Sequence, residues 1–248
     1  MVAAVLAGMV AVMLHSLTFR TVKMLQLSTI PIYVINLARC VERKKKMIAR
    51  LQKHGLLNQT HFVVAHDRDG PLLDSVVIPH TTRAEIACLL SHHKAIEMFL
   101  ACGDEYALML EDDVMFHRDL EVLWRQHIDK LPHVNPTVVM LCTYMIGRSD
   151  PPDLNSHYTT INCSCYGAQS YIISKAYARE VIERYSHLLR GTPSEVRLTS
   201  ENILIESRGV RTKQYLFVEE ALDTNIQNEI SVRWHHDYFS RVGYSCYD

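Results

Sequence analysis

The sequence predicts an α/β fold with a central, mostly parallel sheet flanked by helices. Short apolar runs of strand length alternate along the chain with segments whose apolar residues recur every three or four positions. The runs are apolar throughout, as expected for strands that are covered on both faces. With 248 residues and 48% hydrophobic content, the chain is long enough for one sizeable core. We find no internal repeat or change of composition that would divide this core.

The first strand and helix are predicted over residues 31–55. Residues 31–37 (PIYVINL) form an apolar strand, and residues 40–54 follow in helical rhythm up to Gly55. Arg39, Arg43 and three lysines crowd the start of this helix, where exposed backbone amides already carry partial positive charge. A bound pyrophosphate would offset this charge, because helix starts bind phosphate through backbone amides. The alternative is that these cations are solvated surface residues.

A second strand and a longer helix follow. Residues 61–65 (HFVVA) form the strand, and the next five residues form a turn that contains Asp67. An Asp in this turn would accept hydrogen bonds from a ribose or a base, although Asp-Gly is equally common in simple turns. After a loop over residues 71–80, the helix opens with the capping-box pair Thr82 and Glu85 and is expected to stop near Gly103.

Three consecutive carboxylates end the next strand, which covers residues 106–110 (YALML). Glu111, Asp112 and Asp113 repel one another, so they need either full solvent exposure or a compensating cation. In open α/β sheets the ligand crevice lies just outside the carboxyl ends of the strands. Hard oxygen ligands suit Mn²⁺ or Mg²⁺, and such ions usually hold substrate phosphates as well. The alternative is an acidic cap before the helix that contains residues 119–128.

The rest of the chain continues the alternation of strands and helices. We expect helices over residues 120–131, 175–189 and 199–205, and strands over residues 137–141, 167–174 and 215–218. Residues 150–157 contain two prolines and are expected to form an exposed loop. Ser200 would cap the third helix, which places Glu201 in its first turn, where a carboxylate is also favoured for purely structural reasons.

The formal net charge of -1 gives no reason to expect a nucleic-acid partner. The seven scattered cysteines do not make a complete disulfide framework and favour a reducing compartment. Residues 1–19 are apolar and would extend roughly 28 Å as a helix, enough for a single-pass membrane anchor. The alternative is that Met24 is the true start and residues 1–23 are a tail, which would leave a cytoplasmic protein.

Five short motifs occur in a fixed order over about residues 32–204. They are Ile35-Asn36-Leu37 with Arg43, Ala65 with the Asp-Gly turn, Glu85-Ile86-Ala87-Cys88 with Ser91-His92, Leu110-Glu111-Asp112-Asp113-Val114, and Gly167-Ala168 with Tyr171-Ile172-Ile173-Ser174 and Ala178. In this order and spacing they resemble glycosyltransferase family 25, which contains bacterial lipooligosaccharide galactosyltransferases and procollagen galactosyltransferase domains.

The resemblance implies a GT-A type, Rossmann-like single domain over residues 24–248, in which the acidic triplet plays the role of the DXD motif. Glu111 and Asp113 would bind Mn²⁺ or Mg²⁺, which grips the donor diphosphate, and Asp112 would contact the donor or the metal. The further donor-site residues would be Asn36, Leu37, Arg43, Ala65, Asp67, Ser91 and His92. For Ser91 and His92, packing within their helix is the alternative.

The implied reaction is a metal-dependent, inverting transfer of a hexose, galactose or a related sugar. The donor would be a nucleotide sugar such as a UDP-sugar, and the acceptor a glycan or glycoprotein. The family tends to carry an Asp close to the position of Glu201, which makes Glu201 the first candidate for the catalytic base and Asp223 the second. The alternative function is a catalytically silent, glycosyltransferase-like binding or adhesion module. A phosphohydrolase is disfavoured because Glu111 stands where such enzymes carry a nucleophilic Asp.

Overall fold

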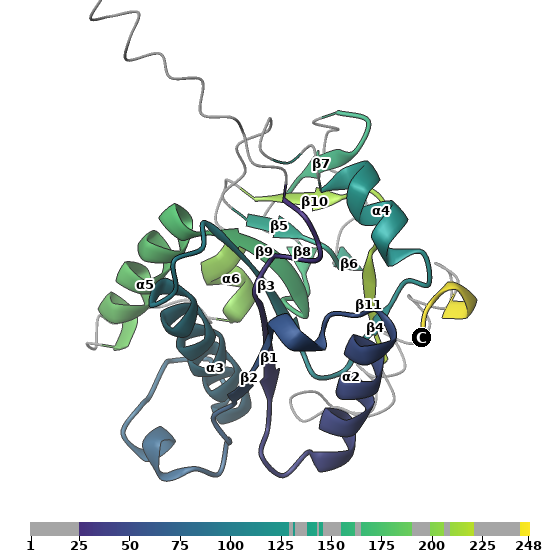
Figure 1. Cartoon of the computed structure of the whole chain (residues 1–248). Helices are drawn as coiled ribbons and strands as arrows, with labels where there is room; N and C mark the ends of the chain where they lie inside the picture. Colours follow the sequence, from purple (N-terminus) through teal and green to yellow (C-terminus); the bar gives the residue numbers. More distant parts are fainter. Residues whose placement is uncertain are drawn as a thin grey trace, which may run out of the picture.

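The core of the protein is a seven-stranded mixed sheet with helices on both faces (Figure 1). The computed structural model describes residues 25–128, 131, 138–142, 144–145, 155–161, 165–189, 199–205, 209–220 and 244–248. The predicted anchor or tail at residues 1–23 and most of the predicted loop at 150–157 lie outside these residues. Within them, no helix combines the length and the apolar character needed to cross a membrane.

The strand order is β2-β1-β3-β9-β5-β10-β7. The strands are β1 (Ile32–Asn36), β2 (Thr60–Val64), β3 (Tyr106–Glu111), β5 (Val138–Met140), β7 (Tyr158–Thr160), β9 (Ser170–Ser174) and β10 (Val210–Thr212). Five of the seven run in one direction, and β9 and β7 run the other way. The α/β class and the mostly parallel central sheet expected from the sequence are therefore confirmed, with β9 as the reversed strand in the middle.

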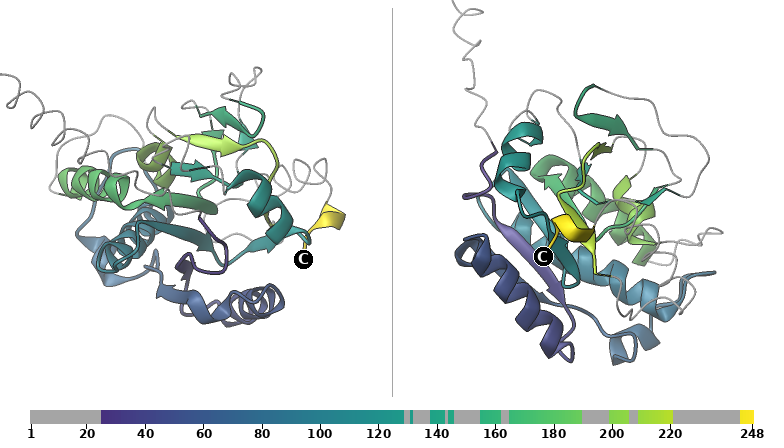
Figure 2. Two further views of the ribbon diagram at one scale, coloured as in Figure 1. Left: turned by 45° about the horizontal axis from the view of Figure 1, so that its top comes forward. Right: turned by 90° about the vertical axis from the view of Figure 1, so that its right-hand side faces the viewer.

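Helices cover the sheet in two layers (Figures 1 and 2). The helices are α2 (Val41–Lys53), α3 (Arg83–Leu100), α4 (Leu120–His127), α5 (Lys175–Leu189) and α6 (Ser200–Ile205). Alternate residues of β1 point to opposite faces, so Val34 packs with α2 and α4, and Tyr33 packs with α3 and α5. The two apolar cores fix α2 and α3 on either side of the strand ends that carry polar residues.

A two-stranded sheet beside the main one was not expected. It pairs β4 (Val114–Phe116), directly after the acidic triplet, with β11 (Phe217–Glu219), the predicted late strand. A second small sheet pairs β6 (Tyr144–Met145) with β8 (Cys165–Tyr166). Such short strands have no clear period in the sequence, and their pairing depends on residues far along the chain.

The ends of several elements differ from prediction. Helix α3 ends at Leu100 with Ala101 as its C-cap, and Gly103 does not adopt the left-handed conformation, so the predicted glycine stop is wrong. Gly55 does adopt it, with a φ of 68°, directly after α2. Ser200 is the first residue of α6, and the predicted loop over residues 71–80 contains a short 3-10 helix, Pro71–Asp74.

The capping box at the start of α3 gives a direct stability test. The Glu85 backbone amide donates to Thr82 Oγ1 at 3.3 Å, and the Glu85 carboxylate accepts from the Thr82 amide at 2.8 Å. We expect Thr82→Ala to lower the free energy of unfolding by about 1 kcal/mol, because a helix amide loses its acceptor. Chemical denaturation measures this change. Thr29→Ala, at an exposed turn, is the control, and an equal effect of both substitutions would contradict the assignment.

Candidate active site

The predicted site residues gather at the carboxyl ends of β1, β2 and β3. In the parallel register, Ile35 lies beside Glu111, and Asn36 lies beside Val64. The last residues of β1 and β3 are therefore neighbours, and Ala65 follows directly after β2. This is the edge at which open α/β sheets bind ligands.

Asp112 and Asp113 are held by groups from β1 and α2. The Asn36 side-chain amide donates to Asp112 Oδ2 at 2.6 Å. Arg43, in the first turn of α2, donates from Nη1 to Asp112 Oδ1 at 2.9 Å and from Nη2 to Asp113 Oδ2 at 2.6 Å. The Arg43 side chain is 15% exposed, and the two Asp side chains are 7% and 12% exposed, so this bridge is screened little by solvent.

The second carboxylate oxygen of Asp113 has no hydrogen-bond partner among the described residues. Asp113 Oδ1 is buried, and the Arg43 guanidinium contacts only Oδ2 of the same carboxylate. Burial raises the pKa of the Asp113 carboxyl well above its ordinary value, and Arg43 only partly opposes this rise. The neighbouring carboxylates of Glu219, Glu111 and Asp112 raise the pKa further. Negative charge therefore exceeds positive charge around Asp113 Oδ1.

Glu219 was not predicted as a site residue, and β11 brings it to this site. The Glu220 amide donates to the Asp113 carbonyl at 2.8 Å, which fixes β11 beside the acidic triplet. Glu219 is buried, and its Oε2 accepts from the Gln169 amide at 2.9 Å. The signal was the run LFVEE at residues 216–220, a second apolar strand that ends in adjacent carboxylates.

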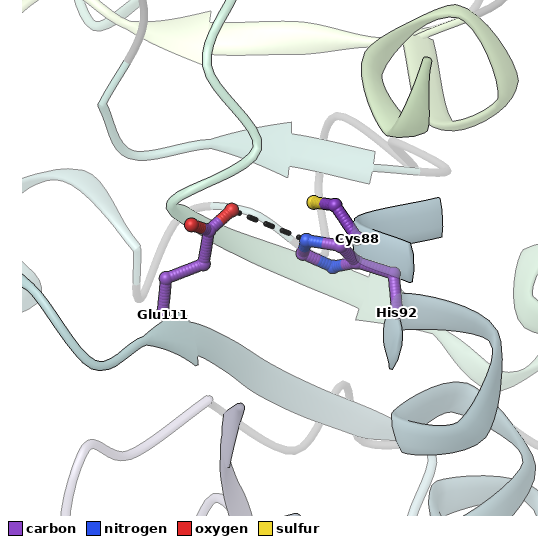
Figure 3. Close-up of side chains that lie close together, drawn as sticks. All are labelled: Cys88, His92 and Glu111. Carbon is purple, nitrogen blue, oxygen red and sulfur yellow. Dashed lines mark hydrogen bonds and ion pairs between the residues drawn. The ribbon is translucent and has the colours of Figure 1, made fainter. Parts of the chain in front are cut away.

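Glu111 faces a different set of partners from Asp112 and Asp113. His92 Nε2 lies 3.2 Å from Glu111 Oε1, and the Cys88 thiol completes a group whose ligand atoms all lie within 4.8 Å of one another (Figure 3). His92 is fully buried, and its Nδ1 lies 3.0 Å from the Tyr171 hydroxyl. The acidic triplet thus divides between Arg43 on one side and Cys88 and His92 on the other. That Glu111 and Asp113 share one ion remains a prediction.

Three other predicted donor-site residues, Leu37, Ala65 and Asp67, lie in the loops that follow β1 and β2. Leu37 begins the turn that leads from β1 into α2, and the Ala65 amide donates to the Asn36 carbonyl at 2.9 Å. Asp67 forms an ion pair with Arg39, and both side chains are exposed. These contacts join the loops after β1 and β2 into one surface beside the acidic triplet.

Ser91 ties one of these loops to α3. Its hydroxyl accepts from the His66 amide at 2.8 Å and donates to the Ala87 carbonyl at 2.6 Å. Both of these hydrogen bonds are to the protein backbone, so the role of Ser91 in the donor site stays a prediction. It holds the turn after β2 in place.

The comparison with known families decides the identity of the chain. The sequence profile of the family described as glycosyltransferase family 25 (LPS biosynthesis protein) matches residues 29–194, more than half of the chain. The chain belongs to glycosyltransferase family 25. The matched span contains the motifs around Asn36, His92 and the acidic triplet, and it ends before Glu201 and Glu219.

Two other comparisons add nothing to this family 25 assignment. No curated protein sequence matches the chain significantly. Among solved structures, the crystal structure of 4-diphosphocytidyl-2C-methyl-D-erythritol synthase from Anaerococcus prevotii is 12% identical, with a TM-score of 0.35, over 86% of this chain and 97% of that one. At this TM-score the likeness supports no conclusion.

Glu201 lies on the Cys88 side of the acidic triplet. Its Oε1 accepts from the Gly167 amide at 3.3 Å, and its Oε2 accepts from the Ser200 hydroxyl at 3.3 Å. Burial raises the pKa of the Cys88 thiol, and the carboxylates of Glu111 and Glu201 raise it further. Glu201 is thus close enough to influence the same group as Glu111. Asp223, the second candidate base, lies outside the described residues.

A divalent cation fits the residues at the end of β3. Asp113 Oδ1 is a buried carboxyl oxygen without a hydrogen-bond partner in the part of the chain that the structure describes, and Glu111 and Asp112 add further carboxylates next to it in the chain. Hard carboxylate ligands of this kind suit Mg²⁺ or Mn²⁺. The donor set therefore agrees with the metal that the family implies.

Proposed function

We propose that this family 25 enzyme transfers a hexose, galactose or a related sugar, from a nucleotide sugar to a hydroxyl group of a glycan or glycoprotein. The donor is a UDP-sugar, the transfer inverts the anomeric carbon, and Mn²⁺ or Mg²⁺ is required. The observation that carries the proposal is the buried Asp113 Oδ1 beside Arg43 at the carboxyl edge of the sheet, which no described residue contacts with a hydrogen bond.

Asp113 and Glu111 would hold the divalent ion. When bound, such an ion supplies positive charge that stabilises the departing nucleoside diphosphate. Arg43 offers a second positive group at the same edge, and its planar guanidinium suits bidentate binding of phosphate. Together these residues provide the charge that a diphosphate leaving group needs.

The residues around this centre would orient the donor. The Asn36 amide already positions Asp112, which would contact the donor or the metal. Asp67, in the exposed loop after β2, would accept hydrogen bonds from the ribose or the base in place of its ion pair with Arg39. Four further residues would shape the donor site. Two lie in the loops after β1 and β2, Leu37 and Ala65, and two lie on α3, Ser91 and His92.

Glu201 is the proposed base, because an inverting transfer needs a carboxylate that takes the proton from the acceptor hydroxyl. We expect Glu201→Gln to lower kcat by about 100- to 1000-fold with little change in donor affinity, since proton transfer is lost and donor contacts are kept. Steady-state kinetics and UDP binding measure the two effects. Glu183→Gln, on the exposed face of α5, is the control. An active Glu201→Gln enzyme, together with an inactive Asp223→Asn enzyme, would move the base to Asp223.

The activity itself is tested by incubating the purified protein with UDP-, GDP- and CMP-sugars in Mn²⁺ and following donor hydrolysis. We expect hydrolysis of a UDP-hexose that stops when EDTA is added. Metal-dependent UDP binding without turnover of any sugar would favour the silent binding module. Turnover that is unaffected by EDTA would contradict the proposed role of the metal.

A further inference from the structure

Three potential metal ligands converge where α3 meets the end of β3. Cys88 and His92 lie one helical turn apart on α3, and Glu111 is the last residue of β3 (Figure 3). Their ligand atoms all lie within 4.8 Å of one another. We propose that Cys88, His92 and Glu111 form a second metal site, selective for Zn²⁺ or a similar thiophilic ion and adjacent to the site of the catalytic Mn²⁺ or Mg²⁺.

The ligand types determine which ion this site prefers. A thiolate, an imidazole and one carboxylate are the ligands that proteins use for Zn²⁺, whereas Mn²⁺ and Mg²⁺ favour oxygen ligands. Three protein ligands leave a fourth position open in a tetrahedral site. Asp112 and Asp113, which supply only oxygen, lie on the Arg43 side of the acidic triplet. The two sides therefore differ in the ions that they select.

The ligands are also held in place by neighbouring side chains. His92 is fully buried, and its Nδ1 lies 3.0 Å from the hydroxyl of Tyr171, so the ring turns Nε2 toward Glu111. A second hydrogen bond of this kind is the usual support for a metal-binding histidine. The Ser200 hydroxyl lies 3.6 Å from Cys88 Sγ and would donate to a bound thiolate in place of the Glu201 carboxylate. Cys88 and Glu111 are partly exposed, which gives an ion access from solvent.

Occupation of this site would inhibit the enzyme, a consequence that rests on the proposed function. Glu111 belongs both to this group and to the pair proposed to hold the catalytic ion. A thiophilic ion on Cys88 and His92 would hold Glu111 on their side of the triplet and keep it from joining Asp113 at the catalytic ion. Low concentrations of Zn²⁺ would then reduce the Mn²⁺-dependent reaction.

Binding is tested with Co²⁺, which reports a bound thiolate by its charge-transfer absorption, added to the metal-free full chain. We expect one equivalent of absorbing Co²⁺ in the wild type that Zn²⁺ displaces. Cys88→Ser should lose that equivalent, whereas Cys246→Ser, at an exposed thiol near the C-terminus, should keep it. Equal absorption in the wild type and in Cys88→Ser would overturn the proposal.

A second variant keeps the test decisive if Cys88→Ser folds poorly. Glu111→Gln retains the thiol and the imidazole, so we expect the absorption to persist with an affinity for Co²⁺ that is lower by more than about tenfold. An unchanged affinity would remove Glu111 from the site and contradict the proposal. Thermal unfolding in EDTA shows which variants are folded.

Inhibition by Zn²⁺ is measured for each protein separately. The rate of Mn²⁺-dependent donor hydrolysis with Zn²⁺ is divided by the rate of the same protein without Zn²⁺. We expect this ratio to fall in the wild type and in Cys246→Ser, and to stay near one in Cys88→Ser. Equal inhibition of all three proteins would contradict the link to Cys88. Because Co²⁺ binding needs no sugar donor, failure of the glycosyltransferase proposal and failure of this metal site give different results.

Discussion

Replacement of Asp113 by Asn is expected to reduce metal-dependent sugar transfer by more than about 1000-fold, or ~4 kcal/mol of transition-state stabilisation. The amide keeps the size of the side chain but removes the charge that binds the ion. The protein should remain folded. Asparagine loses the ion pair with Arg43, but it also removes a buried charge with three carboxylate neighbours. We therefore expect the free energy of unfolding to change by less than about 1 kcal/mol.

Three measurements check this expectation: donor hydrolysis, Mn²⁺ binding followed by electron paramagnetic resonance, and chemical denaturation in EDTA. Asp119→Asn is the matched control, since Asp119 is an exposed aspartate after β4 whose side chain makes no helix-capping hydrogen bond. It should leave all three quantities near the wild-type values. If Asp113→Asn hydrolyses the donor at the wild-type rate, the acidic triplet has no part in the mechanism.

Replacement of Arg43 by Ala is expected to destabilise the metal-free protein by about 2–3 kcal/mol and to weaken donor binding. The substitution removes the guanidinium that bridges Asp112 and Asp113 and leaves their largely buried charges facing each other. This loss of stability is smaller than that expected for a fully buried ion pair, because the side chains of Arg43, Asp112 and Asp113 all retain some exposure. A divalent ion would neutralise the same carboxylates, so Mn²⁺ should restore much of the lost stability.

Thermal unfolding of the Arg43→Ala protein with and without Mn²⁺ measures both effects, and UDP titration measures the donor affinity. Lys45→Ala is the control, because Lys45 lies on the same helix and pairs with Glu42 on an exposed surface. Arg43→Lys should behave more like Arg43→Ala than like the wild type, since one ammonium group does not span two carboxylates. Equal stabilisation of wild type and Arg43→Ala by Mn²⁺ would place the ion away from this bridge.

The sequence alone predicted the elements that carry the site. The apolar run at residues 106–110 and the helical period of residues 82–100 are local signals, so β3 and α3 were found with their order and burial. The pattern did not say which strands pair. Asn36 was expected at the donor site only through the family resemblance, and the structure places its strand beside the one that ends in Glu111.

The remaining features depend on contacts between residues far apart in the chain. Arg43 and Asp113 are separated by 70 positions, and no local pattern connects them. Glu219 reaches the site only because β11 pairs with β4, which is too short to have a period of its own. The spacing of Cys88 and His92 places them on one side of α3, but the third ligand depends on how α3 packs against β3. The spacing of apolar residues likewise does not encode the direction of a strand. The antiparallel orientation of β9 could therefore not be predicted from the sequence.

Calorimetric titration of UDP into the full chain, with Mn²⁺ and again with EDTA, tests most directly whether a divalent ion at the end of β3 binds a nucleotide diphosphate. We expect saturable heat in Mn²⁺ that disappears in EDTA and is also lost in Asp113→Asn. UDP binding of equal strength with and without the metal would contradict this account, as would unchanged metal-dependent binding in Asp113→Asn.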